Sequence, residues 1–183
     1  MEVKGATTLL YTLAGLMITF AGFSSLLLIL RQAAGARVSL LDRYLARTVM
    51  TYIFVLTAAA LLPMLLALYG IEERWIWRVS AVLFTLPMLS LQASYPRRRR
   101  KVVGKGPPFA IYAIFVVTGS AATLALLVYV LLGLQFSAAA DYNSAAYITA
   151  VTIDFFTVIF GFVNALDIIM LQPMEAPERP APQ

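Results

Sequence analysis

Residues 142–171 read YNSAAYITAVTIDFFTVIFGFVNALDIIML, an apolar run long enough to cross a bilayer as one helix. This run contains two carboxylates, Asp154 and Asp167, with Asn164 between them. A charge near the bilayer centre costs about 3 kcal/mol or more, so ionisable residues there usually face a protein interior or water and often have a function. The segment therefore predicts both a membrane-spanning helix and a candidate functional site.

The composition of the whole chain is typical of a membrane protein. Of the 183 residues, 61% are hydrophobic and 13% are charged, and the mean hydropathy is +0.84. A soluble domain is about 45–50% apolar and about 25% charged. The apolar residues gather in several long runs, which predict an all-α membrane protein with one transmembrane domain over residues 1–172.

Five apolar segments are long enough to be transmembrane helices, and a short interfacial helix is expected at residues 40–47. Pro63 and Pro87 interrupt the second and third segments, where each removes a backbone hydrogen bond and is expected to bend its helix. The proline-rich tail, residues 173–183, is predicted to be disordered. The predicted spans are residues 7–30, 48–69, 75–92, 109–134 and 144–171.

The distribution of lysine and arginine predicts the orientation of these spans. The first and third loops and the tail hold 11 of the 14 basic residues, and the amino terminus and the other loops hold three. Cytoplasmic loops of membrane proteins carry an excess of lysine and arginine. We therefore expect the amino terminus outside, the carboxyl terminus in the cytoplasm, and the chain in a cell (inner) membrane.

Two residue types are absent, and their absence narrows the function. The chain has no cysteine and no histidine. This excludes disulfides, thiolate and histidine metal sites, and the usual histidine general base. With no recognisable nucleophile–base pair, we predict a protein that is not an enzyme and has no cofactor or metal. The net charge of +5 is confined to short loops, so nucleic acid is not expected as a partner.

The first helix and the segment after it resemble a known group of proteins. The matching residues are Ala21-Gly22-Phe23-Ser24 and Arg31, followed by Leu41-Asp42-Arg43 and Arg47. With them the chain resembles small multi-pass bacterial membrane proteins that have an Ala-Gly-Phe-Ser type first helix and are mostly uncharacterised. Ser25 departs from the glycine of that pattern. The resemblance implies a multi-pass membrane protein, but no activity and no site residues.

Polar residues of the fifth span recur at helical spacing. Asp154, Thr157, Gly161 and Asn164 are separated by three or four residues and share one helix face, with Asp167 toward its edge. The two carboxylates are about 20 Å apart along the helix axis, too far for a paired-carboxylate catalytic site. One hypothesis is a polar track for protons or small cations, formed by Asp154, Thr157, Asn164 and Asp167. The alternative is a neutral Asp154 that is hydrogen-bonded to a serine or threonine of a neighbouring helix, with Asp167 paired to an interfacial arginine.

The third loop is the most basic part of the chain. Its positive side chains can hold anionic lipid headgroups, each contributing about 1 kcal/mol near a membrane surface. Alternatively, they only determine the topology. The candidate lipid-binding residues are Arg97, Arg98, Arg99, Arg100, Lys101 and Lys105.

Small residues line one face of the first span and the centre of the fourth, residues 118–123. Such faces permit close helix packing, so we expect these two spans to pack together or to contact another subunit. Together with the polar face, they predict an oligomeric channel or a small-ion or proton transporter subunit. The alternative function is a non-enzymatic scaffold or accessory subunit that binds a membrane partner or anionic lipid.

Overall fold

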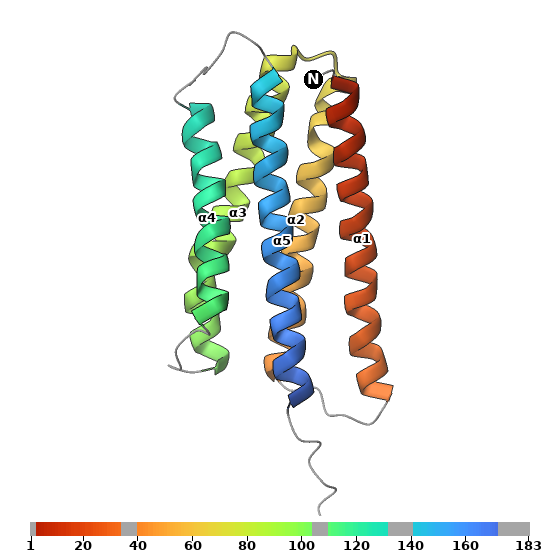
Figure 1. Cartoon of the computed structure of the whole chain (residues 1–183), viewed down its shortest axis with the longest axis vertical. Coiled ribbons are helices and arrows are strands. Elements are labelled where there is room, and N and C mark those ends of the chain that lie inside the picture. The colour runs from red at the N-terminus through yellow and green to blue at the C-terminus, as the bar shows by residue number, and fades with distance from the viewer. Residues whose placement is uncertain (1–2, 34–39, 104–109, 132–140, 172–183) are drawn as a thin grey trace, which may run out of the picture.

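The computed structural model describes residues 3–33, 40–103, 110–131 and 141–171, and all of these residues lie in helices except the short link between the second and third helices. Figure 1 shows the helices as a bundle of long, roughly parallel rods. The predicted all-α fold is confirmed. The helices are α1 (Val3–Ala33), α2 (Leu40–Leu68), α3 (Glu73–Val103), α4 (Ala110–Leu131) and α5 (Asp141–Leu171).

Four of the five helices are long and apolar enough to cross a membrane, which marks the chain as a membrane protein. Their spanning segments are Gly5–Leu30, Arg43–Leu68, Glu73–Val102 and Ser144–Val163. The described apolar part of α4, Val117–Tyr129, is shorter. A fifth crossing by α4 therefore stays a prediction.

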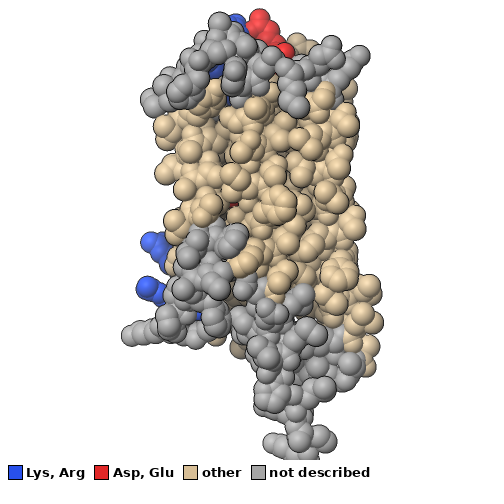
Figure 2. Space-filling model, viewed as in Figure 1, with Lys and Arg blue, Asp and Glu red and all other residues tan. Residues whose placement is uncertain are grey.

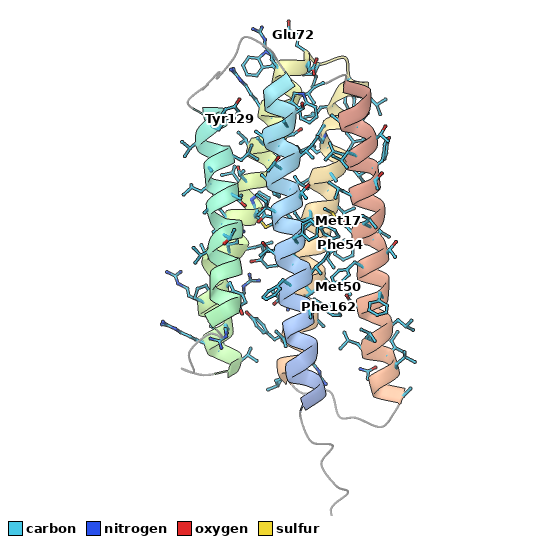
Figure 3. All side chains as sticks on the ribbon, in the orientation of Figure 1. Met17, Met50, Phe54, Glu72, Tyr129 and Phe162 are labelled. Atoms are coloured by element: carbon cyan, nitrogen blue, oxygen red, sulfur yellow. The ribbon has the colours of Figure 1, made fainter. Side chains whose placement is uncertain are left out.

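The helix α5 lies at the centre of the bundle and packs against each of the other four helices. At the two sides of Figure 1, the described residues of α1 pack on α2 and α5, whereas those of α4 pack on α3 and α5. Aromatic and sulfur-containing side chains fill the space beside α1: Met17 and Phe162 are buried, and the ring centroid of Phe20 lies 5.0 Å from that of Phe162 (Figure 3).

Of the two contacts expected for the small-residue faces, the packing of the first span against the fourth is wrong, since α1 and α4 do not touch within the described residues. A contact with another subunit stays a prediction. Small residues show that a close approach is possible, but they do not identify the partner. On α1, Gly22 faces open space within this chain, whereas on α4 Gly119 is packed directly against side chains of α5.

Successive helices run in opposite directions, so each helix begins at the end of the bundle where the helix before it ends (Figure 1). The α2–α3 link turns at Gly70, whose φ of +69° is easily adopted by glycine. Glu72 lies at this end, and Arg97–Lys101 lie toward the opposite end, which we call the basic end. On the face shown in Figure 2, blue and red side chains appear toward the two ends, and the described surface between them is almost entirely tan.

Two predicted boundaries change in the structure. The segment 40–47 is not a separate helix, because it forms the first turns of a continuous α2. The third span, expected at residues 75–92, continues as α3 to Val103, so the arginine run is helical and not a loop. Pro96 has no N–H, so only the Gln92 carbonyl four residues earlier loses its donor within the helix. The adjacent Leu91 carbonyl accepts a hydrogen bond of 2.8 Å from Arg98 Nη2.

A buried tyrosine compensates for the proline inside α2. Pro63 has no N–H to donate to the Ala59 carbonyl four residues earlier. Instead, the hydroxyl of Tyr147 on α5 donates to that carbonyl at 2.7 Å. The ring centroids of Trp77 and Phe84 on α3 each lie 5.9 Å from that of Tyr147. Tyr147 therefore joins α5 to α2 at a carbonyl that has no hydrogen-bond donor within α2.

We predict that Tyr147→Phe lowers the free energy of unfolding in detergent micelles by about 1 kcal/mol, because the Ala59 carbonyl is left buried without a donor. In a Pro63→Ala background, which restores the backbone donor, the same substitution should cost less. The control is Tyr11→Phe on the exposed face of α1, which should change little. Equal losses in both backgrounds would contradict the compensation.

Candidate functional site

Asp154 lies deep inside the bundle. Only 1% of its surface is exposed, and by helical rise it sits about 20 Å from the start of α5 at Asp141. Both ends of α5 are thus distant, and the carboxyl group must find its polar partners inside the protein. This is the residue that the sequence marks as the main candidate.

Two neighbouring helices supply those partners. Thr123 of α4 donates its hydroxyl to Asp154 Oδ2 at 2.6 Å, and Gln92 of α3 places Nε2 at 3.5 Å from Oδ1. Both partners are uncharged and buried. Within the described part of the chain, no lysine or arginine forms an ion pair with Asp154. The carboxyl group therefore joins three helices without a counter-charge.

A glycine makes room for this contact. An added Cβ on Gly119 of α4 would lie 2.8 Å from Asp154 Oδ1 and 3.1 Å from Thr157 Oγ1. Gly119 and Thr123 are four residues apart on α4, and Asp154 and Thr157 are three apart on α5, so each pair lies on one face of its helix. The small-residue face of α4 is thus the surface that receives the polar face of α5.

The positions of the oxygen atoms suit a protonated carboxyl group. Thr123 Oγ1 lies 2.6 Å from Asp154 Oδ2 and 2.9 Å from the Gly119 carbonyl. One hydroxyl proton cannot be donated to both oxygens. If Asp154 carries the proton, it donates to Thr123, and Thr123 donates to Gly119. If Asp154 is ionised, the threonine hydroxyl turns toward the carboxylate instead. The site therefore has two hydrogen-bond arrangements that differ by one proton.

The other residues of the predicted polar track are only partly visible. Thr157 is half-buried beside Gly119, and its hydroxyl donates to the Ile153 carbonyl at 2.9 Å. Asn164 and Asp167 belong to α5, but their side chains lie outside the described residues. A track continuing beyond Thr157 thus remains a prediction.

The basic residues separate into two groups. Arg97, Arg100 and Lys101 are exposed on the last turns of α3. Arg98 and Arg99 are half-buried, and Arg98 turns back along α3 to reach the Leu91 carbonyl. Lys105 lies outside the described residues, as does the tail at 173–183.

Three residues of the site are absent from the sequence-based prediction: Gln92, Gly119 and Thr123. Gln92 appears in the sequence only as the end of the third span, and the other two only as small residues at the centre of the fourth. Gln92 could have been predicted to have a hydrogen-bond partner, because it is an amide within an apolar run and few polar residues in such runs lack one. No signal identified which span each would face.

No protein-family model, curated protein or solved structure matches this chain. Among the residues that the structure describes, no group of three or more aspartate or glutamate residues is placed to hold a metal ion.

We predict that Gly119→Ala destabilises the protein by about 1–3 kcal/mol, since the added methyl group must displace the carboxyl of Asp154 or shift α4 from α5. Chemical unfolding in detergent measures the loss. The matched control is Gly22→Ala on α1, where nothing lies within 4 Å of the added Cβ. Equal stability of the two variants would show that the close contact does not constrain the bundle.

Proposed function

We propose that the protein is a proton-transporting membrane protein in which Asp154 binds and releases the transported proton. The proposal places it in a cell (inner) membrane with five spans, the amino terminus outside and the basic end in the cytoplasm. Because five helices enclose little space beyond their own side chains, the transporting unit is proposed to be an oligomer of this chain or a complex with a membrane partner.

The observation that carries this proposal is a fully buried carboxyl group held by two neutral side chains. Isolated charges are expensive in such surroundings, so the group exchanges between a neutral form at rest and a charged form of higher energy. The hydroxyl of Thr123 can follow this exchange by rotating between Gly119 and Asp154. A purely apolar residue would pack here without needing any of these partners.

The geometry favours a proton over a metal cation as the transported species. Calcium takes 6–8 oxygen ligands and magnesium about six. Around Asp154 the described residues offer the carboxylate itself and the hydroxyls of Thr123 and Thr157, the second of which already donates to the Ile153 carbonyl, while the nearer atom of Gln92 is a nitrogen donor. A proton needs only one oxygen and one acceptor beside it, and both are present.

We predict that Asp154→Asn abolishes proton flux in proteoliposomes, measured with a pH-sensitive dye trapped inside. Asparagine has the same shape and can still bond to Thr123, so folding and assembly should be retained by size-exclusion chromatography in detergent.

The control for this experiment is Glu72→Gln, which removes a carboxylate from the exposed α2–α3 link and should leave the flux unchanged. If the unmodified protein carries no protons or small cations at any pH tested, or if Asp154→Asn transports normally, the proposed function is wrong.

A second candidate function rests on the exposed side chains of Arg97, Arg100 and Lys101 at the basic end. We propose that they bind anionic lipid headgroups, which would suit a scaffold or accessory subunit as well as a transporter. Three exposed cations on consecutive turns of one helix end can contact several headgroups at once, each worth about 1 kcal/mol.

We predict that anionic phospholipid raises the thermal stability of the protein in mixed micelles more than zwitterionic phospholipid does. Replacing Arg97, Arg100 and Lys101 by glutamine should remove most of the difference. The control, Arg74→Gln at the opposite end, should keep it. A preference for anionic lipid that survives the triple substitution would assign it to other residues.

A further inference from the structure

We propose that protons reach Asp154 from the basic end only, through a cluster of polar side chains between α2 and α3 formed by Tyr44, Tyr52, Gln92 and Arg98, which we call the access cluster. This inference rests on the proposed proton exchange at Asp154 and adds its direction. Between α2 and α3, polar side chains lie on the basic-end side of the carboxyl group, and packed aromatic rings lie on the other side.

Gln92 is the first member of the access cluster. Its Nε2 faces Asp154 Oδ1 at 3.5 Å, while its Oε1 is buried and has no hydrogen-bond partner. An amide both donates and accepts, so it can link the carboxyl group to a water molecule on its far side. Its own backbone carbonyl adds an acceptor, since Pro96 has no N–H to donate to it.

Arg98 is the next member toward the basic end. Its side chain does not extend outward with those of Arg97 and Arg100, because Nη2 bonds to the Leu91 carbonyl, next to Gln92. Its Nε is buried and has no partner. Unpartnered N–H and C=O groups inside a protein are rare and commonly mark ordered water. Arg98 thus supplies a buried donor, and Gln92 a buried acceptor, for water along the same helix.

The tyrosines of α2 continue the cluster. Tyr52 lies within electrostatic range of both Asp154 and Arg98. Tyr44 lies one turn from the start of α2, and its hydroxyl is buried beside that of Thr48 on the same helix. The two tyrosines are about 12 Å apart along the helix by its rise, which two or three hydrogen-bonded waters can bridge. The cluster therefore extends from the buried carboxyl group to the basic end of the bundle.

The positions of the charged and titratable groups around Asp154 are consistent with proton access from the basic end. On α2 they are Tyr44 and Tyr52, and on α3 they are Tyr95, Arg98 and Arg99 at the basic end. Within the described side chains of α1 and α4, the titratable groups are Tyr11 and Tyr129. Tyr11 is exposed and lies near the start of α1, and Tyr129 lies near the end of α4 in Figure 3, so neither is at the level of Asp154.

The opposite side is closed by rings. Between Asp154 and the start of α5, the rings of Tyr147, Trp77 and Phe84 pack together, and the Tyr147 hydroxyl is already bonded to Ala59. The described side chains there include two unpartnered buried hydroxyls, on Ser80 of α3 and Thr57 of α2. Each is a single hydroxyl, and neither bonds to the carboxyl group or its partners.

The test is hydrogen–deuterium exchange of the Asp154 carboxyl group in the full-length protein reconstituted in lipid. Infrared spectroscopy follows the carbonyl stretch of the protonated acid, assigned by its absence in Asp154→Asn, after transfer to deuterated buffer. Gln92→Leu and Tyr52→Phe should each slow the exchange about tenfold, the equivalent of one lost hydrogen bond. Ser80→Ala, the control on the closed side, should leave the rate unchanged.

Three results would overturn the inference: exchange rates that neither Gln92→Leu nor Tyr52→Phe changes, a slower rate in Ser80→Ala, or no protonated Asp154 band at any pH. Tyr52→Phe keeps the test valid if Gln92→Leu does not fold. The flux assay gives a separate answer, because a carboxyl group that exchanges through the access cluster without net transport refutes the proposed function and not the access route.

Discussion

The close approach of α4 to α5 at Gly119 is the constraint on which the rest of the site depends. A carboxyl group within a membrane-spanning segment needs its hydrogen bonds from protein, because lipid offers none. Thr123 can donate to Asp154 at 2.6 Å only because no side chain stands at Gly119, where a Cβ would lie 2.8 Å from the carboxylate. The glycine thus determines the distance between two helices, and that distance permits the hydrogen bond.

Two polar side chains of α5 then give the central helix its register. Tyr147 bonds to α2 and Asp154 to α3 and α4, and they are seven residues apart, about two helical turns. Apolar packing alone specifies register weakly in a membrane, since one aliphatic contact is replaced by another when helices slide. A sliding of α5 by one turn would remove both sets of hydrogen bonds. These bonds therefore select one arrangement of helices that otherwise differ little in apolar character.

The sequence predicts the helices and the candidate residue Asp154, but it does not predict which helices and side chains pack against one another. Helices follow from long apolar runs, and Asp154 stands out because a carboxylate in such a run is rare, so both could be predicted. Its partners could not, because Thr123 and Gln92 lie 31 and 62 residues away and nothing in their spacing shows which helix they face. For the same reason, the sequence did not show that the first and fourth spans pack on different helices. The arginine run was predicted as a loop from its charge alone, although arginine is a good helix former.

The structural and the functional interpretations of Asp154 need not exclude each other. The hydroxyl of Thr123 stabilises the packing of α4 on α5 in either of its two orientations, so the fold tolerates both protonation forms. A transport site differs from a structural hydrogen bond because protons can reach it from solvent. The two sides of Asp154 differ in the polar side chains that could provide such a route. Between α2 and α3, an unpartnered amide oxygen and an inward-turned arginine lie toward the basic end, whereas three packed rings and two single unpartnered hydroxyls lie on the other side. A carboxyl group with only a structural role would have no need of polar neighbours on one side, and this inequality is the reason for proposing proton exchange at Asp154.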